Sequence, residues 1–320
     1  TLLKYALQEN FDFIMSDHKR HHLHYFKEIG FEKVFWLPAF NIFPHEQPHY
    51  KDKLYTVSFV GQAGRWHPYR KNILQYLNAK GIKLNIFQVP QLKAAEIYTQ
   101  SLINLNISLN GDLNLRVFEV LSSGGFLLTD KLTIESGLEL LFKDGQHLVC
   151  FENDSDLLDK IRYFLQHPDE AKAIAQNGYE EFQRNHTPEK KTKELSDYIF
   201  KGELNPLYDI RKDKRSIYVK TGSPTELSRR VALYEFFQEI HLTTTSVSIL
   251  LWPNVDGRVA CDVLDLPRLR LFIKNDDNQI PDQNARLFQN TEMAERIKLV
   301  TTEQLGQMNL FWNVLVITAS

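Results

Sequence analysis

The stretch INLNISLNGDLNLRVFEVLSSGGFLLTD, residues 103–130, decides the fold class that we expect for this chain. Its first part predicts a strand over 102–109, the next part has the pattern of a helix over 115–123, and the last part predicts a strand over 125–130. A strand, a helix and a strand in this order form a βαβ unit, whose strands are parallel. We therefore expect an α/β fold.

The same alternation continues on both sides of this unit. Strands are predicted at 11–17, 34–40, 55–61, 83–89 and 147–151, the last at a sheet edge, and helices at 18–28, 69–79, 93–101, 154–166 and 168–184. Asp154 or Ser155 can cap the helix at 154–166, and Pro168 suits the first turn of the next helix. The whole pattern indicates a parallel sheet covered by helices, as in Rossmann-like domains.

Two prolines and the absence of apolar periodicity mark NIFPHEQPHYKDK, residues 41–53, as a linker between domains. We expect residues 1–48 to be the tail end of an N-terminal Rossmann-like domain with this linker. A second Rossmann-like domain is predicted at 49–205, followed by a further α/β module of unknown role at 212–320.

The module at 212–320 repeats the α/β alternation. We predict strands at 216–219, 246–253, 269–275, 296–302 and 312–318, and helices at 224–240 and 283–295. The strand ending in ILLW leads into PNVDG, which is weakly similar to S-adenosylmethionine-dependent methyltransferases, but Gly257 stands where those enzymes have a glycine-rich turn. A scaffolding domain or the opening half of another transferase domain fits the pattern as well.

Charge and composition exclude several classes of function. The 38 basic and 40 acidic residues nearly cancel, so the chain lacks the net positive charge typical of nucleic-acid-binding proteins. Cys150 and Cys261 are too few for a disulfide framework or a cysteine-rich zinc site. The histidines of SDHKRHHLH, residues 16–24, lack the further ligands that would complete a metal site, so we expect no metal.

The sequence contains no membrane-spanning run and no secretion signal at its start, so we expect a cytoplasmic protein. It begins at Thr1 and stops at Ser320 directly after an apolar run. We therefore expect it to be a fragment that lacks most of an N-terminal domain.

The start of the helix at 115–123 is the first candidate binding site. Free N–H groups at a helix start attract anions such as a pyrophosphate, and Gly111 would allow close approach. Arg116 and Glu119 are three residues apart and share one helix face, which would place a guanidinium beside phosphate oxygens and a carboxylate beside ribose hydroxyls. The alternative is an ordinary solvated ion pair on a helix that the following glycines merely end.

Three blocks of sequence carry a family resemblance. They are FVGQAGRWHPYRKNIL at 59–74, INLNISLNGDLNLRVFEVLSSGGFLLTD at 103–130, and GLELLFKDGQHLVCFENDSDLLDKIRYFLQHPDEAKAIAQNGYEEFQRNHT at 137–187. In this order they resemble the CgeB-like branch of the group 1 glycosyltransferases, over about residues 35–200.

The resemblance implies a GT-B fold, in which two Rossmann-like domains flank a cleft and the C-terminal one holds a nucleotide-sugar donor without a metal. It assigns Glu119 to the donor ribose and Gly61 to the glycine turn that lines the phosphate cleft. The donor would also contact Gly111, Asn114, Leu115 and Arg116, while Arg65, Arg70 or Lys71 would neutralise the leaving diphosphate.

The chain departs from the wider group in one respect. A first glutamate often stands eight residues before the ribose-binding one, where this chain has Gly111 beside Asp112. We expect transfer of a sugar from a nucleotide diphosphate sugar to an acceptor that is a glycan, a protein or a small molecule, with retention at the anomeric carbon by family likeness alone. The alternatives are a noncatalytic scaffold with a GT-B-derived fold and a bifunctional protein whose last module is a methyltransferase.

Overall fold

The computed structural model describes most of the chain between residues 52 and 209 and shorter pieces elsewhere. The described residues are 9, 11–17, 20, 23–28, 31–38, 52–64, 67–109, 111–132, 136–209, 236, 247–252, 269–274, 297–307 and 316–318. The chain divides into two compact units: 1–14, 21–34 and 210–320 form one, and 15–20 and 35–209 form the other. Each unit is described by itself.

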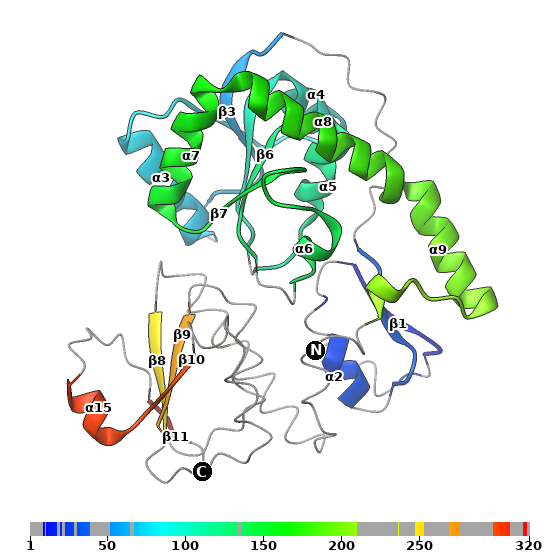
Figure 1. Ribbon diagram of the computed structural model, residues 1–320, viewed down its shortest axis with the longest axis vertical. Coiled ribbons are helices and arrows are strands. Elements are labelled where there is room, and N and C mark those ends of the chain that lie inside the picture. The colour runs from blue at the N-terminus through cyan, green and yellow to red at the C-terminus, as the bar shows by residue number, and fades with distance from the viewer. Residues whose placement is uncertain are drawn as a thin grey trace. The chain divides into compact units, whose positions relative to one another are not determined.

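The larger unit contains a five-stranded parallel sheet, so its α/β class is confirmed (Figure 1). Its strands are β3 (Tyr55–Val60), β4 (Leu84–Phe87), β5 (Ser101–Asn106), β6 (Leu127–Asp130) and β7 (Val149–Phe151), in the order β4-β3-β5-β6-β7. The predicted edge position of the strand near residue 150 is confirmed. The chain passes from β3 to β4 on one side and then to β5 on the other side of β3, so the topological switch point of the sheet lies between β3 and β5.

Helices connect the strands and cover the sheet. They are α3 (Pro68–Ala79), α4 (Gln91–Gln100), α5 (Leu115–Ser122), α6 (Leu138–Leu141), α7 (Asp154–Gln166) and α8 (Pro168–Asn185). Contacts join α3 to α7, α4 to α5, and α5 to α8. The predicted helices at 69–79, 93–101, 115–123, 154–166 and 168–184 all form within two residues of these bounds.

Strand and helix side chains meet in one apolar core. The strands contribute Val57, Phe59, Ile103, Leu105, Leu128 and Phe151, and the helices contribute Ile73, Leu77, Leu157, Ile161 and Ile174. Burial of each such side chain contributes roughly 1.5–3 kcal/mol to folding. The core therefore fixes the sheet whose strand ends carry the polar residues discussed below.

Gly178 stands in the middle of α8 for a packing reason. A Cβ atom at this position would lie 2.3 Å from the carbonyl oxygen of His147 and 2.7 Å from Leu121 of α5. Glycine lets α8 approach α5 closely, which secures the helix that carries Arg116 and Glu119.

One local prediction differs from the structure, and one helix was not predicted. Asn153, rather than Asp154 or Ser155, is the N-cap of α7, since its side-chain oxygen accepts hydrogen bonds from the N–H groups of Ser155 and Asp156. The sequence also gave no indication of α9 (Pro188–Lys201), an exposed helix with one fully buried residue, Lys191. Pro168 does begin α8, as predicted.

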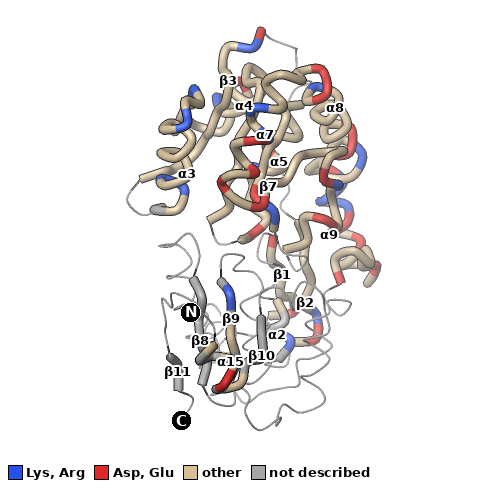
Figure 2. Tube along the Cα trace, turned by 60° about the vertical axis from the view of Figure 1, so that its left-hand side comes forward, with Lys and Arg blue, Asp and Glu red and all other residues tan. Residues whose placement is uncertain are grey.

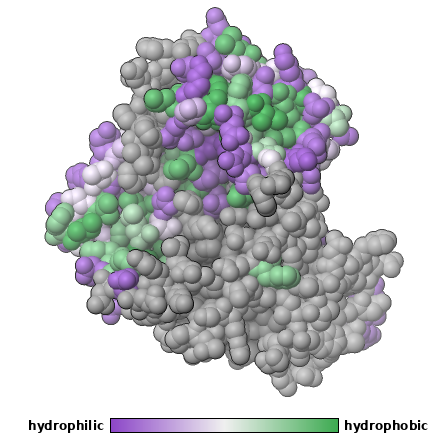
Figure 3. Space-filling view, turned by 180° about the vertical axis from the view of Figure 1, so that it is seen from behind, coloured by the Kyte–Doolittle hydropathy of each residue, from purple (hydrophilic) through white to green (hydrophobic). Residues whose placement is uncertain are grey.

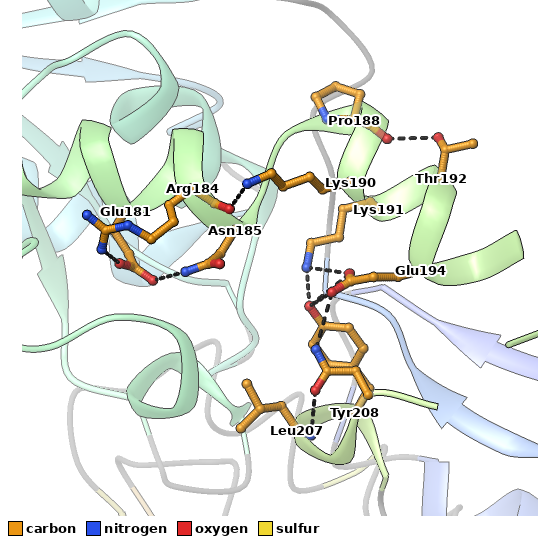
Figure 4. A network of polar contacts seen from close by, with 11 residues as sticks. Glu181, Arg184, Asn185, Pro188, Lys190, Lys191, Thr192, Glu194, Leu207 and Tyr208 are labelled. Atoms are coloured by element: carbon orange, nitrogen blue, oxygen red, sulfur yellow. Dashed lines mark hydrogen bonds and ion pairs between the residues drawn. The ribbon is translucent and has the colours of Figure 1, made fainter. Parts of the chain in front are cut away.

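Polar contacts join α9 to the short helix η3 (Pro206–Tyr208) (Figure 4). Aromatic contacts join α9 and η3 to residues of β2 (Val34–Trp36). The ring of Phe35 lies 4.3 Å from that of Tyr198, and Trp36 meets Tyr208 edge-on at 5.9 Å. β2 pairs with β1 (Ile14–Ser16) in a separate two-stranded sheet. Residues near position 36 thus pack with the helices that follow the five-stranded sheet.

The smaller unit also has a parallel sheet. Its strands β8 (Val247–Trp252), β9 (Leu269–Lys274), β10 (Ile297–Val300) and β11 (Val316–Thr318) are arranged in the order β10-β9-β8-β11, and α15 (Thr302–Gln307) follows β10. The predicted strands near 250, 270, 298 and 315 are therefore confirmed. The strand predicted at 216–219 and the helix predicted at 283–295 lie outside the described residues, as does Gly257.

The surface of the described residues is neither uniformly charged nor uniformly apolar. Both acidic and basic residues lie along α8 and α9 (Figure 2), and one face mixes hydrophilic with hydrophobic residues (Figure 3). Among the described residues, no helix has the length and apolar character needed to cross a membrane.

Candidate functional site

The candidate site lies at the carboxyl ends of β3 and β5, at the switch point of the sheet. Gly61 directly follows β3, and the segment 107–114 leads from β5 into α5. Open parallel sheets bind their ligands outside the carboxyl ends of the strands at such a reversal. The fold therefore brings together Gly61 and the start of α5, which are 54 residues apart in sequence.

Arg116 fills the space beside Gly61. A Cβ atom built on Gly61 would lie 2.2 Å from Nη2 of Arg116, so no larger residue fits while Arg116 keeps its place. Gly61 has a φ of +146°, and its N–H donates to the carbonyl of Phe87 over 2.8 Å. The Arg116 guanidinium also lies 4.8 Å from the ring centre of Phe59, a favourable cation–π distance.

Neutral side chains hold the Arg116 guanidinium. Its Nη1 donates to Oδ1 of Asn106 over 2.8 Å, and Nδ2 of Asn114 donates to the same oxygen over 3.3 Å. Among the described residues, no ion pair of Arg116 with a carboxylate is found. Its positive charge is therefore available to an anionic ligand.

The N-terminus of α5 lacks a side-chain cap. Asn114 occupies the N-cap position, but its side chain accepts no hydrogen bond from the first turn and instead donates to Asn106. The first N–H groups of a helix have no partner within the helix, and the helix dipole favours an anion there. With Arg116 in the same turn, this end of α5 suits a phosphate group. Leu115, the first helical residue, is 43% exposed, so a ligand can reach this turn.

Glu119, one turn further along α5, is held by two side chains of α4. Nε2 of Gln91 donates to its Oε1 over 2.8 Å, and the Tyr98 hydroxyl donates to its Oε2 over 3.2 Å. Burial, and next the charge of Glu119, raise the pKa of Tyr98, so this hydroxyl keeps its proton and stays a donor. A carboxylate offers about four acceptor positions, which leaves one on each oxygen for further donors.

The basic residues proposed for the leaving diphosphate differ in their surroundings. Arg70 is buried, and it donates to the carbonyl oxygens of Ile107 over 2.9 Å and of Gln62 over 3.4 Å, thereby joining the segments that follow β5 and β3. Lys71 is exposed on α3, and Arg65 lies outside the described residues. Gly111 is buried in the segment before α5 and has a φ of +71°.

Sequence reasoning did not find Gln91, Tyr98 or Asn106. Each reaches the site through a contact distant in sequence: 28 residues for Gln91 to Glu119, 21 for Tyr98 to Glu119 and 10 for Asn106 to Arg116. The polar residue Asn106 at the end of a buried strand was the available signal. It marks a buried polar group that needs partners.

Residues 48–197 match a family model described as glycosyl transferase-like. This segment contains β3 to α8 and every site residue discussed above. None of the curated proteins matches the chain. The CgeB-like placement stays a prediction.

Several solved structures are similar to the chain at low identity. Sucrose-phosphate synthase from Thermosynechococcus elongatus is 12% identical with a TM-score of 0.47, and the match covers 63% of this chain and 62% of that one. TarM is 12% identical with a TM-score of 0.48, and the match covers 62% of this chain and 45% of TarM. The pneumococcal O-GlcNAc transferase GtfA, solved with UDP and GlcNAc, is 11% identical with a TM-score of 0.46, and the match covers 62% of this chain and 46% of GtfA. The chain thus spans less than two thirds of each of these proteins.

Proposed function

We propose that this chain supplies the donor-binding half of a glycosyltransferase that moves a sugar from a nucleotide diphosphate sugar to an acceptor without a metal. The observation that carries the proposal is the Arg116 guanidinium, placed against Gly61 at the uncapped start of α5 without an ion pair among the described residues. The match of residues 48–197 to a glycosyl transferase-like model supports the same activity.

The diphosphate would rest between Gly61 and the first turn of α5. As the bond from the sugar to the diphosphate breaks, negative charge grows on the leaving oxygen. Arg116 and the free N–H groups of α5 would stabilise that charge, which is greater in the transition state than in the bound donor. The described residues contain no group of three metal-ligating side chains. Metal independence itself is part of the proposal.

Glu119 would bind the ribose of the donor. Gln91 and Tyr98 use one acceptor position on each of its oxygens, and the remaining positions suit two adjacent hydroxyl groups. Two hydroxyls on neighbouring carbons are the feature that ribose presents. The nucleobase, the transferred sugar and the acceptor stay open, as does the cytoplasmic location.

A calorimetric titration with UDP, GDP and their sugar conjugates tests the donor site. We expect one nucleotide to bind, and Glu119→Ala to weaken its binding by about 1.5–3 kcal/mol, the contribution of a charged hydrogen-bonding group. Glu180→Ala is the matched control, because Glu180 is an exposed residue of α8. Equal effects of the two substitutions, or no binding to the folded protein, would contradict the proposal.

The rival function is a noncatalytic binding protein that kept this fold. One observation favours it: both oxygens of Glu119 already accept hydrogen bonds from protein side chains. A turnover assay separates the two functions. Sugar transfer or slow hydrolysis of the donor that Glu119→Ala abolishes would reject the binding protein, whereas binding without turnover in the full-length protein would support it.

A further inference from the structure

Buried polar side chains form a row where β5 and β6 end. Asn106 and Thr129 are partners in the register of these two parallel strands, and Asp130 follows Thr129. The three side chains are 1%, 0% and 8% exposed. Polar groups buried this deeply need partners, so their hydrogen bonds constrain one another.

The direction of each hydrogen bond follows from Asp130. An ionised carboxylate only accepts, and Asp130 accepts from the N–H and the hydroxyl of Ser108, the former over 2.8 Å. The Thr129 hydroxyl also donates to Asp130 over 3.4 Å, a long and therefore weak hydrogen bond. Because this hydroxyl has one proton and donates it to Asp130, its oxygen accepts a hydrogen bond from Nδ2 of Asn106 over 2.9 Å.

The orientation of the Asn106 amide is thereby set. Its nitrogen faces Thr129, so its oxygen faces α5 and accepts from Arg116 over 2.8 Å and from Asn114 over 3.3 Å. A flipped amide would turn its N–H donors toward the guanidinium and toward Nδ2 of Asn114, which are donors themselves. Asn106 therefore presents a fixed acceptor to Arg116.

We infer that Asp130, Thr129 and Asn106 form a positioning chain that holds the Arg116 guanidinium against Gly61, ready for the diphosphate. The inference rests on the proposed function for its ligand. Two neutral residues stand between the carboxylate of Asp130 and the guanidinium. The positioning chain thus orients the Arg116 guanidinium as an ion pair would, yet leaves the positive charge of Arg116 available to the ligand.

The charge argument explains why a carboxylate does not hold Arg116 directly. A carboxylate at position 106 would form a strong charge-assisted pair with the guanidinium and compete with phosphate oxygens for it. An amide oxygen accepts the same hydrogen bond without that competition. Asn106→Asp, which has nearly the same shape, introduces this competition and at the same time removes the donor to Thr129.

The first test needs no ligand. Nuclear magnetic resonance of the guanidinium nitrogens, with the Arg116 signal assigned through Arg116→Lys, reports whether the side chain is held in one orientation. We expect hindered rotation in the unaltered protein and in Thr129→Ser, which keeps the hydroxyl, and free rotation in Thr129→Val, which removes it. The exposed Arg162 of α7 serves as an internal reference that no variant changes.

The second test measures binding of inorganic pyrophosphate, UDP and GDP, with uridine and guanosine as phosphate-free controls. Thr129→Val and Asn106→Asp are each expected to weaken binding of the phosphate compounds about tenfold, the effect of losing one charged hydrogen bond, and to leave nucleoside binding unchanged. Thr129→Ser restores binding. If Thr129 and Asn106 had a purely structural role, their substitution would weaken the binding of nucleosides and of nucleotides alike.

The outcomes separate the inference from the proposed function. Arg116 signals that are the same in folded Thr129→Val as in the unaltered protein would overturn the positioning chain. If Thr129→Val does not fold, the Asn106→Asp variant decides instead. An affinity for pyrophosphate equal to that of the unaltered protein, with rotation of the Arg116 guanidinium still hindered, would overturn the inference equally. An ordered Arg116 that depends on Thr129 in a protein that binds no nucleotide would refute the proposed function alone.

Discussion

Gly61 and Arg116 occupy adjoining space, since a Cβ atom on Gly61 would lie 2.2 Å from Nη2 of Arg116. We predict that Gly61→Ala displaces the guanidinium and weakens binding of the nucleotide diphosphate at least about tenfold, as for the loss of a charged hydrogen bond. The measurement is a calorimetric titration.

Gly81→Ala is the matched control for Gly61→Ala. Gly81 also has a positive φ, +80°, but nothing lies within 4 Å of a Cβ built there. Both substitutions are expected to lower the free energy of unfolding by about 1 kcal/mol through backbone strain. Only Gly61→Ala should impair binding, and a similar loss in both variants would show that strain, rather than the displacement of Arg116, is responsible.

Tyr98→Phe tests whether the two side chains on Glu119 shape ribose recognition. The substitution removes the hydroxyl that donates to Oε2 of Glu119 and leaves the buried ring in place. We expect the preference for a ribonucleotide over its 2′-deoxy counterpart to fall about threefold to tenfold, the value of one hydrogen bond. Tyr76→Phe, on the half-buried ring of α3, should leave the preference unchanged.

Local sequence patterns predicted the elements of the five-stranded sheet because strands and helices there alternate with clear apolar periodicity. The start of α5 was predicted as a binding site since position after a strand and the residue types Arg116 and Glu119 are local features. Strand order is not local, so the switch point between β3 and β5 was found only in the structure.

Partners distant in sequence account for most of what was missed. Asn106 reads as one residue of a strand until the register with β6 places it beside Thr129. α9 is mostly exposed and polar, and its one fully buried residue is a lysine, which apolar periodicity does not reveal. The structure buries His186, which directly follows α8, against the aromatic rings of Phe118 and Phe142, and these contacts are also distant in sequence.

Lys191 anchors α9 to η3, and its removal should destabilise the protein. Its ammonium group contacts the Tyr208 hydroxyl and lies 3.1 Å from Oε2 of Glu194, which also accepts from Tyr208 over 3.1 Å (Figure 4). Burial lowers the pKa of Lys191, and the charge of Glu194 opposes that shift. Breaking a buried pair by removing one partner costs about 3 kcal/mol.

Urea denaturation of Lys191→Ala measures this loss. Lys193→Ala is the control, because Lys193 forms an exposed ion pair with Asp197 on the same helix, and exposed pairs contribute little to stability. Equal stability of the two variants would mean that the buried network makes no net contribution to the attachment of α9.

His186 is predicted to make the protein sensitive to acid. The residue is buried, neither ring nitrogen has a hydrogen-bond partner, and its ring packs against Phe142 at 4.8 Å and Phe118 of α5 at 5.8 Å. Burial, and then the positive charge of Lys191, lower its pKa to about 3 from the usual 6.5. The folded state therefore keeps His186 neutral over a range in which the unfolded state binds a proton.

His186 affects the stability of the protein only below about pH 6.5, which is the pKa of this histidine in the unfolded state. Above pH 6.5 His186 is neutral in both states, and as the pH falls from 6.5 toward 3 the unfolded state gains a proton that the folded state does not. The free energy of unfolding then decreases by up to about 1.4 kcal/mol per pH unit. His186→Phe removes this loss, so its advantage over the unaltered protein should be about 2 kcal/mol larger at pH 5 than at pH 7.

Urea denaturation at pH 7, 6 and 5 measures that difference. At pH 7 the variant should already be more stable by about 1 kcal/mol, because phenylalanine leaves no unpaired polar atoms among the aromatic rings. A stability difference that stays constant between pH 7 and pH 5 would show that His186 takes up a proton equally in both states, and that the aromatic site does not hold it neutral.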